Sequence, residues 1–277
     1  MPSVFRTICF CIAFSGAGPA PLPASAAPAD LAVIRSATVT AVVDGDTLML
    51  ANGQELRLTG IQAPKLALGR RNFDDWPLAT NAKVVLEKLS LGKVLILHRD
   101  GNTQDRHGRI LAHAVGADGT WLQGEMVAQG MARVYTFADN RSQSKDLYER
   151  ERAAREQNLG IWALPYYAIR SADADALSRD YGTFQIVEGT VLDAAKVRSR
   201  VYLNFGRDYR DDFTVAIDRQ VWPLFAGDAQ ALLDLEGLTI RVRGWIKDFN
   251  GPLIDVTHPE QIEVIHGDGL SDTALID

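Results

Sequence analysis

Apolar and polar residues alternate over positions 38–43 and again over positions 48–50, on either side of Asp44-Gly45-Asp46-Thr47. A period of two is typical of a β-strand with one buried face, and an Asp-Gly pair between two such segments predicts a tight hairpin. A third strand is expected over Glu55–Ile61, and it ends before Pro64 because proline cannot continue a β-ladder. The pattern therefore predicts a three-stranded meander with polar groups clustered at one end.

Two interpretations of this polar cluster remain open at the level of the sequence. Asp44 and Asp46 are residue types that cap the backbone amides of a turn. The same carboxylates, with Arg57 on the neighbouring strand and the strand end at Gln62, also have the composition of a phosphate site.

The segments that follow have the periodicity of helices and further strands. Helical spacing of apolar residues predicts an amphipathic helix over Trp76–Ser90. A short helix is expected over Leu122–Ala128, before Gly130, and a long charged helix over Asp139–Asn158, closed by Gly160. Strands are expected over Lys93–Arg99 and from Arg109 onward. Five strands with three helices in this order indicate an OB-type barrel.

The second half of the chain has a strand pattern of its own. Residues 165–182 are expected to form a linker with a short helix after Ser171. Strands, a helical run and a hairpin at Asn250-Gly251 follow within 183–266, which predicts a second, smaller OB-like β-barrel, and 267–277 is expected to be a disordered tail. The fold class is therefore mainly β with α (α+β), with the five-stranded barrel over 31–164 and the OB-like domain over 183–266.

Residues 1–26 have the order of a secretory signal peptide. Arg6 precedes a short apolar run, and Ala24-Ser25-Ala26 has the Ala-x-Ala form of a cleavage site. The alternative, a buried N-terminal helix, is disfavoured by the glycines and prolines of this stretch. The apolar run is too short to span a membrane, so we expect a periplasmic or secreted protein. Cys9 and Cys11 both lie in this segment, so the exported chain would contain no thiol.

Charge is divided unevenly between the two halves. Positions 31–164 hold 17 Lys and Arg against 15 Asp and Glu, a net charge of +2, whereas positions 165–277 hold 11 against 19, a net charge of −8. A strongly acidic region repels polyanions, so contact with nucleic acid is expected in the first half. OB barrels often bind oligonucleotides through aromatic and basic residues, which in the second domain would be Tyr202, Phe205, Tyr209, Phe249, Arg207 and Arg210. Because this domain is strongly acidic, we expect instead that these residues pack in the core or contact a protein partner.

Six motifs in the first half resemble, in order and approximate spacing, those of the thermonuclease (staphylococcal-nuclease-like) family. They are Asp44-Gly45-Asp46-Thr47, Arg57-Leu58, Ala63-Pro64, Asp105-Arg106-His107-Gly108-Arg109, Glu125-Met126-Val127-Ala128-Gln129-Gly130 and Gly160-Ile161-Trp162. The resemblance covers about residues 36–162. It implies the OB-type fold and a nuclease scaffold that acts on phosphodiester bonds of DNA or RNA.

The resemblance also implies roles for individual residues. In the family, calcium is held by the second aspartate of the first motif, by an aspartate at the end of the third strand and by the next residue's carbonyl. Two arginines clamp the scissile phosphate, and a glutamate after the proline activates water. Position by position, Asp46 matches the first calcium ligand and Ala63 the carbonyl donor. Arg57 and Arg109 match the clamp.

Two positions depart from the family pattern, because Gln62 replaces the second aspartate and Lys65 replaces the glutamate. Together they make the pocket three charge units more positive. At about 4 Å and an effective dielectric constant near 20, one unit charge pair contributes roughly 4 kcal/mol, and a divalent ion doubles that figure. Calcium binding should then be weak or absent, so no cofactor is expected, with calcium implied only if the protein is an active enzyme. Lysine is also a poor general base at neutral pH.

We therefore hypothesise that Lys65 stands in for the calcium ion. Arg57, Lys65 and Arg109 would then bind a nucleic acid or another phosphorylated ligand without hydrolysing it. Two alternatives stay open: Lys65 points to solvent, or the protein is an active nuclease with a site rebuilt from Asp44, Asp74 or Asp75. Arg70 and Arg71, in the loop after Lys65, either touch a phosphate strand or are merely solvated.

Overall fold

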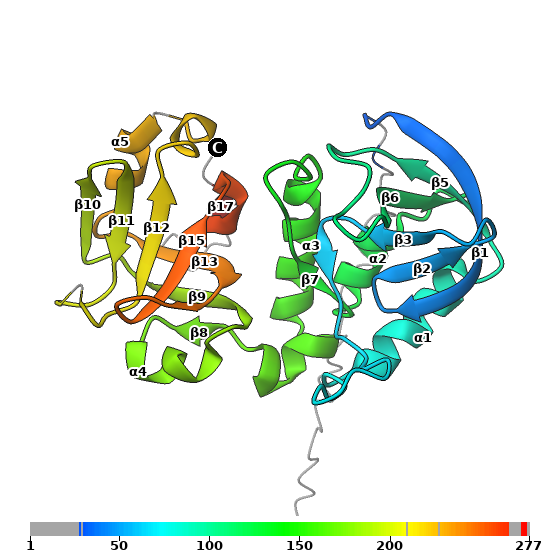
Figure 1. Cartoon of the computed structure of the whole chain (residues 1–277), viewed down its shortest axis with the longest axis horizontal. Coiled ribbons are helices and arrows are strands. Elements are labelled where there is room, and N and C mark those ends of the chain that lie inside the picture. The colour runs from blue at the N-terminus through cyan, green and yellow to red at the C-terminus, as the bar shows by residue number, and fades with distance from the viewer. Residues whose placement is uncertain (1–27, 29, 209, 227, 266–272, 276–277) are drawn as a thin grey trace, which may run out of the picture.

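The computed structural model describes residues 28, 30–208, 210–226, 228–265 and 273–275. The expected signal peptide, including Cys9 and Cys11, lies outside these residues. Figure 1 shows two β-rich domains side by side, with helix α3 (Ser144–Glu156) and strand β7 (Arg133–Val134) where they meet. Within the described residues, no helix has the length and apolar content needed to cross a membrane.

The first domain contains the expected five-stranded barrel. Its strands close in the order β1 (Val33–Asp44), β2 (Thr47–Leu50), β3 (Glu55–Leu58), β6 (Ile110–Gly116) and β5 (Val94–His98). Strands β3 and β6 run parallel, and the other neighbours run antiparallel. Leu48, Leu56 and Leu95 are fully buried in the barrel core. The alternation expected in the first strand is interrupted: Val39 is buried, but Ala41 is exposed and Val42 is buried in its place, because the β1–β2 register shifts between Val39 and Ala41.

Three helices accompany the barrel, as predicted, although two of them begin later than the periodicity suggests. Helix α2 spans Leu122–Ala128, α1 spans Ala79–Ser90, and α3 begins at Ser144. Leu78, just before α1, has a left-handed backbone with φ of 66°. Before α3, Ser142 donates hydrogen bonds from its backbone and its hydroxyl to the Asp100 carboxylate, so these donors are used outside the helix.

The third strand of the meander is divided in two, because it leaves the barrel at Thr59-Gly60. Gly60 has φ of 78°, a backbone conformation that glycine adopts at little cost. The chain continues as β4 (Ile61–Gln62), which pairs with β7 instead of a barrel strand. This departure places Gln62, one of the two residues that depart from the family pattern, against Arg133. It also sets the course of the chain that leads to Lys65, the other one.

The strands of the second domain follow the order of those in the first, but two of them are each divided into two shorter strands. Strands β10 (Asp193–Val197), β11 (Arg200–Asn204) and β12 (Thr214–Asp218) form an antiparallel series, and β12 pairs in parallel with β15 (Pro252–Val256), as β3 does with β6. Strand β15 pairs with β14 (Lys247–Asp248), and β13 (Thr239–Trp245) pairs with β9 (Phe184–Thr190). Helix α5 (Asp228–Leu233) lies between β12 and β13 in the chain.

The expected second barrel is therefore OB-like in connectivity but not closed. Its described strands form two five-stranded sheets, because β9 is separated from β10 by residues 191–192 and β13 from β14 by Ile246. Strand β16 (Ile262–Ile265) extends one sheet beyond β13. Sequence patterning predicted the main strands but not β10, β14 or β16, which are short or lie at a sheet edge.

Two segments expected to lack regular packing belong to the second domain. The linker over 165–182 contains the expected short helix α4 (Ala174–Leu177), but β8 (Arg170–Ser171) pairs with β9 and Leu177 is fully buried in the core. Within the expected tail, β17 (Thr273–Leu275) pairs with β16. Residues 267–272 and 276–277 lie outside the described residues. Five 3-10 turns complete the elements, at Gly160–Ala163, Pro165–Tyr167, Ser178–Asp180, Trp222–Leu224 and Pro259–Gln261.

A buried ion network joins the two domains. The Arg243 guanidinium, from β13, lies 2.9 Å from a carboxylate oxygen of Glu151 on α3 and also pairs with Glu263 on β16. Arg243 donates to the Val134 carbonyl at 3.2 Å, and the Val134 amide donates to Glu151 at 2.8 Å. Burial opposes charge on Arg243, but the facing carboxylates and Tyr148 raise its pKa above the ordinary value. The second domain therefore braces β7, which in turn holds β4.

We expect Arg243→Met to lower the free energy of unfolding by about 3–5 kcal/mol, because it leaves the Glu151 and Glu263 carboxylates buried without their cation. Chemical denaturation measures the change. Arg241→Met is the matched control, since Arg241 lies on the same strand in a more exposed pair with Glu188 and should cost only about 1 kcal/mol. Equal losses in the two variants would contradict the assignment.

A second contact between the domains predicts a pH dependence. The buried His258 ring lies 2.7 Å from the Thr136 hydroxyl, and burial together with the nearby Arg141 charge lowers the pKa of His258 to about 4. The unfolded chain then binds the proton first, so stability should fall by up to about 3 kcal/mol as the pH drops from about 6.5 to 4. The free energy of unfolding, measured by denaturation at several pH values in that range, should depend less on pH in His258→Gln. The same pH dependence in both proteins would count against this assignment.

Candidate functional site

The β1–β2 hairpin turn is held tightly against the end of β4 and helix α1. The Asp44 carboxylate accepts a hydrogen bond from the Asp46 amide at 3.1 Å, as expected for turn capping. A Cβ atom on Gly45 would lie 2.6 Å from the Ala63 Cβ and 2.7 Å from the Ala82 Cβ, so a residue larger than glycine would clash. The packing fixes the fully buried Asp46 side chain at the strand end.

Lys65 lies against this turn and bridges its two carboxylates. The Lys65 ammonium nitrogen is 2.6 and 2.7 Å from the two oxygens of Asp46, and 3.3 Å from an oxygen of Asp44. Only 20% of the Lys65 side chain is exposed. Its ammonium is therefore directed into the turn, whereas the alternative interpretation has it pointing to solvent.

Arg57 reaches the same carboxylate from β3. Its guanidinium lies 3.3 Å from Asp46 and donates to the carbonyl of Ile61 at 2.7 Å and to that of Leu58. The side chain is 12% exposed. Arg57 and Lys65 thus approach Asp46 together, and Arg57 also satisfies backbone carbonyls where the third strand leaves the barrel.

The two turn carboxylates have opposite pKa shifts. Burial alone would raise the pKa of Asp46, but the Arg57 and Lys65 charges and a 2.8 Å hydrogen bond from the Ala63 amide lower it well below its ordinary value. Burial and the charge of Asp46 raise the pKa of Asp44, and Lys65 partly offsets that rise. Asp46 is therefore the permanently ionised member of the pair.

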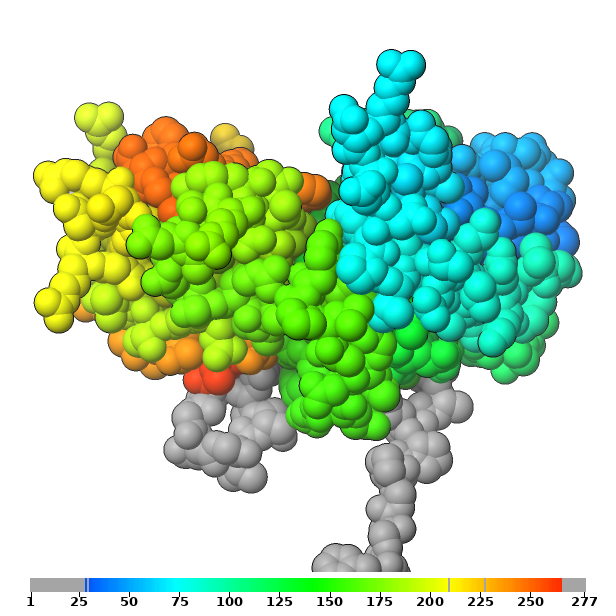
Figure 2. All heavy atoms as spheres, turned by 90° about the horizontal axis from the view of Figure 1, so that it is seen from below, coloured from blue at the N-terminus to red at the C-terminus, as the bar shows by residue number. Residues whose placement is uncertain are grey.

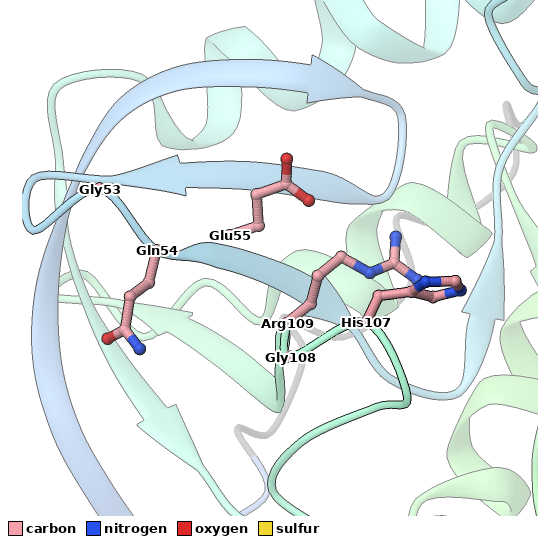
Figure 3. A pocket seen from close by; sticks show the side chains of 6 residues that line it. All are labelled: Gly53, Gln54, Glu55, His107, Gly108 and Arg109. Carbon is pink, nitrogen blue, oxygen red and sulfur yellow. The ribbon is translucent and has the colours of Figure 1, made fainter. Parts of the chain in front are cut away.

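Arg109 lies one strand away from Arg57, in an ion pair of its own. Its guanidinium is 2.7 Å from the Asp105 carboxylate, which also accepts hydrogen bonds from the backbone amides of His107 and Arg109. Arg109 lines a hollow of about 560 Å³ with Gly53, Gln54, Glu55, His107 and Gly108 (Figure 3). The side chain is 29% exposed, the most accessible of the three predicted phosphate contacts.

None of the sequence motifs assigns a role to Glu55. The side chains of Glu55 and Arg57 lie on the same face of β3, because side chains two positions apart point the same way. Figure 3 shows the Glu55 carboxylate above the same hollow as the Arg109 guanidinium and the His107 ring. The alternation that predicted the strand is enough to place Glu55 and Arg57 on one face of it, whereas the family motif points to the position of Lys65.

Gln62 does not face the turn carboxylates. Its side-chain oxygen accepts hydrogen bonds from Arg133 Nε at 3.0 Å and Arg133 Nη2 at 2.7 Å, and both side chains are buried. The Arg133 guanidinium lies 4.7 Å from the ring centre of Phe184, in the second domain. Burial lowers the pKa of Arg133 to about 10, so it remains a cation at neutral pH. The glutamine is therefore part of a connection between the site and the second domain.

The donor set of the turn does not fit calcium. Calcium takes six to eight oxygen ligands, usually with several carboxylates. The Asp46 oxygens already accept hydrogen bonds from the Lys65 ammonium, the Ala63 amide and the Thr47 hydroxyl. Within the described ranges, no group of three or more His, Cys, Asp and Glu residues is arranged to hold a metal.

Comparison with known proteins supports the resemblance. Residues 55–164 match the sequence model of the family described as Staphylococcal nuclease homologue. This region is a staphylococcal-nuclease-like domain. A relative from Capnoides sempervirens, named "Uncharacterized 38.1 kDa protein", is 34% identical over 115 residues, which cover 42% of this chain and 30% of the relative. The shared part is thus less than a third of that relative, whose name states no activity.

The nuclease-like domain allows a direct test of the role of Lys65. Lys65→Met should lower the free energy of unfolding at pH 7 by about 2 kcal/mol, because Asp46 and Asp44 lose the hydrogen bonds to their shared cation. The deficit should shrink as the pH falls toward 4, since the carboxylates of the variant, without the lysine charge that lowers the pKa of Asp46, are protonated at higher pH than in the unmodified protein and then need no cation.

Thermal or chemical denaturation at several pH values measures this deficit. Lys88→Met is the matched control, because it removes an exposed lysine of the same domain. A lysine that is only a solvated surface group would behave like Lys88, with no pH-dependent deficit.

Proposed function

We propose that the protein is exported and that its nuclease-like domain binds a phosphodiester of nucleic-acid type without metal and without efficient hydrolysis. The single observation that carries this proposal is the position of the Lys65 ammonium nitrogen, within 2.7 Å of both Asp46 carboxylate oxygens. In the family that this domain resembles, the carboxylate that corresponds to Asp46 coordinates calcium. A lysine in that position supplies positive charge to a phosphate without requiring an ion.

The balance of charges around the turn supports the binding of a phosphate more than its hydrolysis. Asp44 and Asp46 are balanced by Arg57 and Lys65, so the turn is electrically neutral before a ligand arrives. Arg109, with 29% of its side chain exposed, and Lys65, with 20%, are the accessible cations for a phosphate. The position of the water-activating glutamate is occupied by Lys65 itself, which is a poor base while it remains an ammonium ion.

Nucleic acid is the ligand class that the scaffold favours. The nuclease-like domain implies contact with DNA or RNA phosphates, and the net charge of +2 over residues 31–164 is compatible with such contact, whereas the second half is strongly acidic. Part of the acidic charge of the second domain is used within the chain, because Glu260 pairs with Arg141, and Glu263 with Arg155. For export, the support is the signal-like order of residues 1–26.

A second candidate function is an active nuclease with a rebuilt site. Glu55 and His107 favour it, because both line the hollow beside Arg109 and could serve as acid and base groups there. Asp74 and Asp75 give it less support, since the Asp75 carboxylate accepts a hydrogen bond from the Ala67 amide at 2.6 Å and so braces its own loop. In this candidate, calcium would be a cofactor.

Binding of a nucleoside 3′,5′-bisphosphate, measured by calorimetry, tests the proposal. Affinity should be the same in calcium and in chelator, and Lys65→Ala should weaken it by about 1.5–3 kcal/mol, the usual range for a charged hydrogen bond. Lys88→Ala should leave it unchanged. The same samples are then assayed for cleavage of single-stranded DNA and RNA with calcium, with other divalent ions and with chelator. Robust, chelator-sensitive cleavage that disappears in Glu55→Gln would favour the second candidate instead.

A further inference from the structure

Aromatic and basic side chains gather beside the turn, on the loop that follows Lys65. The Phe73 and Trp76 rings are stacked, with centres 6.2 Å apart and planes 25° apart, and Trp76 lies 6.1 Å from the ring of Tyr166. The Arg70 guanidinium lies 3.8 Å from the centre of the Phe73 ring. We call Arg70, Arg71, Phe73, Trp76 and Tyr166 the aromatic ledge.

The ledge is attached to the candidate site by a short, ordered path. The Trp76 amide donates to the Lys65 carbonyl at 2.8 Å, so the loop closes back on the residue that bridges the turn. The hydroxyl of Tyr167, next to Tyr166, donates to the Pro77 carbonyl at 2.7 Å. In Figure 2 the cyan segment that contains this loop projects from the surface at the upper edge of the view.

Core packing does not account for these side chains. Tyr166 is 47% exposed, Arg70 and Arg71 are exposed, and Phe73 and Trp76 are only partly buried. The Arg70 side chain is also held in place, since its Nε donates to the Ala67 carbonyl at 3.0 Å and its Nη2 to the Leu66 carbonyl. A cation held over one aromatic ring, beside the half-exposed ring of Tyr166 and the partly exposed ring of Trp76, is suited to stacking with a planar ligand.

The charge of the loop favours an anionic ligand by a small margin. Between Lys65 and Trp76 the chain carries three cations, Lys65, Arg70 and Arg71, against the two carboxylates of Asp74 and Asp75. The Asp75 carboxylate is turned back toward the Ala67 amide. Rings for bases and cations for phosphates therefore lie within one loop, which is the combination that binds single-stranded nucleic acid.

We propose that the aromatic ledge stacks the unpaired bases of a single-stranded nucleic acid whose backbone passes Lys65. This inference rests on the proposed function and deepens it by naming the ligand as single-stranded. Bases in a duplex have both faces covered by their neighbours, so only a strand with unstacked bases can lie on Trp76 and Tyr166. Arg71 would contact a phosphate and make binding dependent on salt.

Binding of a labelled 12-nucleotide oligothymidylate to the full chain in chelator tests the ledge. Tyr166→Ala and Trp76→Leu should each weaken binding about 5- to 150-fold, the range for loss of one base stack. Trp76→Phe, which keeps a ring, should retain most of the affinity, and this variant also guards against a loss of folding. Phe249→Ala is the matched control, because Phe249 is a 61% exposed aromatic residue of the second domain, and it should have no effect.

Three further comparisons separate the ledge from the phosphate site. Arg71→Ala should reduce the salt dependence of oligothymidylate binding, and a hairpin duplex of the same length should bind more weakly than the single strand. Nucleoside bisphosphate affinity should be unchanged in Tyr166→Ala, since that ligand reaches only the phosphate site.

The two proposals fail in different ways. If Trp76-dependent binding of the single strand persists while the bisphosphate does not bind, the phosphate site at Lys65 on which the proposed function rests is wrong and the ledge stands. If the bisphosphate binds and the single strand is insensitive to both Tyr166→Ala and Trp76→Leu, the ledge is overturned. Equal binding of the duplex with equal sensitivity to these changes also overturns it.

Discussion

The buried Asp46 carboxylate is the constraint on which the site depends. A fully buried carboxylate carries a large desolvation cost, and the surrounding groups are those that offset it: Lys65, Arg57 and the Ala63 amide. These contacts join the hairpin turn, the third strand and the end of β4. Because the same charge holds three chain segments, a change at Lys65 affects both the local structure and the ligand chemistry.

The second domain supports this arrangement from a distance. Arg243 braces β7 through Val134 and Glu151, β7 pairs with β4, and Arg133 connects Gln62 on β4 to Phe184. The path consists of buried hydrogen bonds, an ion pair and, at Phe184, a cation–π contact. Removing one partner of a buried hydrogen bond or ion pair destabilises a protein strongly. The nuclease-like domain and the second domain are therefore best treated as one structural unit in any experiment on the site.

The sequence predicted those parts of the structure that depend on local periodicity. Alternation gave the β1–β2–β3 meander, and helical spacing gave α2 with its bounds, because each pattern reports which face of an element is buried. The departures from the family pattern at Gln62 and Lys65 could also be recognised in the sequence, which led to the expectation that the site lies in the first half. The helix starts after Leu78 and Gln143 could not be recognised, since they depend on local backbone conformation and on hydrogen bonds to distant residues.

Contacts between distant positions lay beyond the sequence. Gln62 and Arg133 are 71 residues apart, and Arg243 and Glu151 are 92 apart, so no local pattern relates them. For that reason Gln62 could be recognised as a departure from the family pattern but not as a partner of Arg133. The packing of 165–182 onto the second domain escaped for the same reason, because β8 is only two residues long and its partner strand lies 17 positions further along the chain.

The most direct test of the central claim, that Lys65 occupies the place of the ion, is a calorimetric titration of calcium into the unmodified, metal-free protein. Calcium that met the carboxylate of Asp46 would have to displace an ammonium held at 2.6 and 2.7 Å, and no second carboxylate comes from Gln62. If Lys65 occupies the place of the ion, calcium should give no saturable heat up to millimolar concentration and no rise in melting temperature. Saturable binding, accompanied by a calcium-dependent rise in melting temperature, would contradict it.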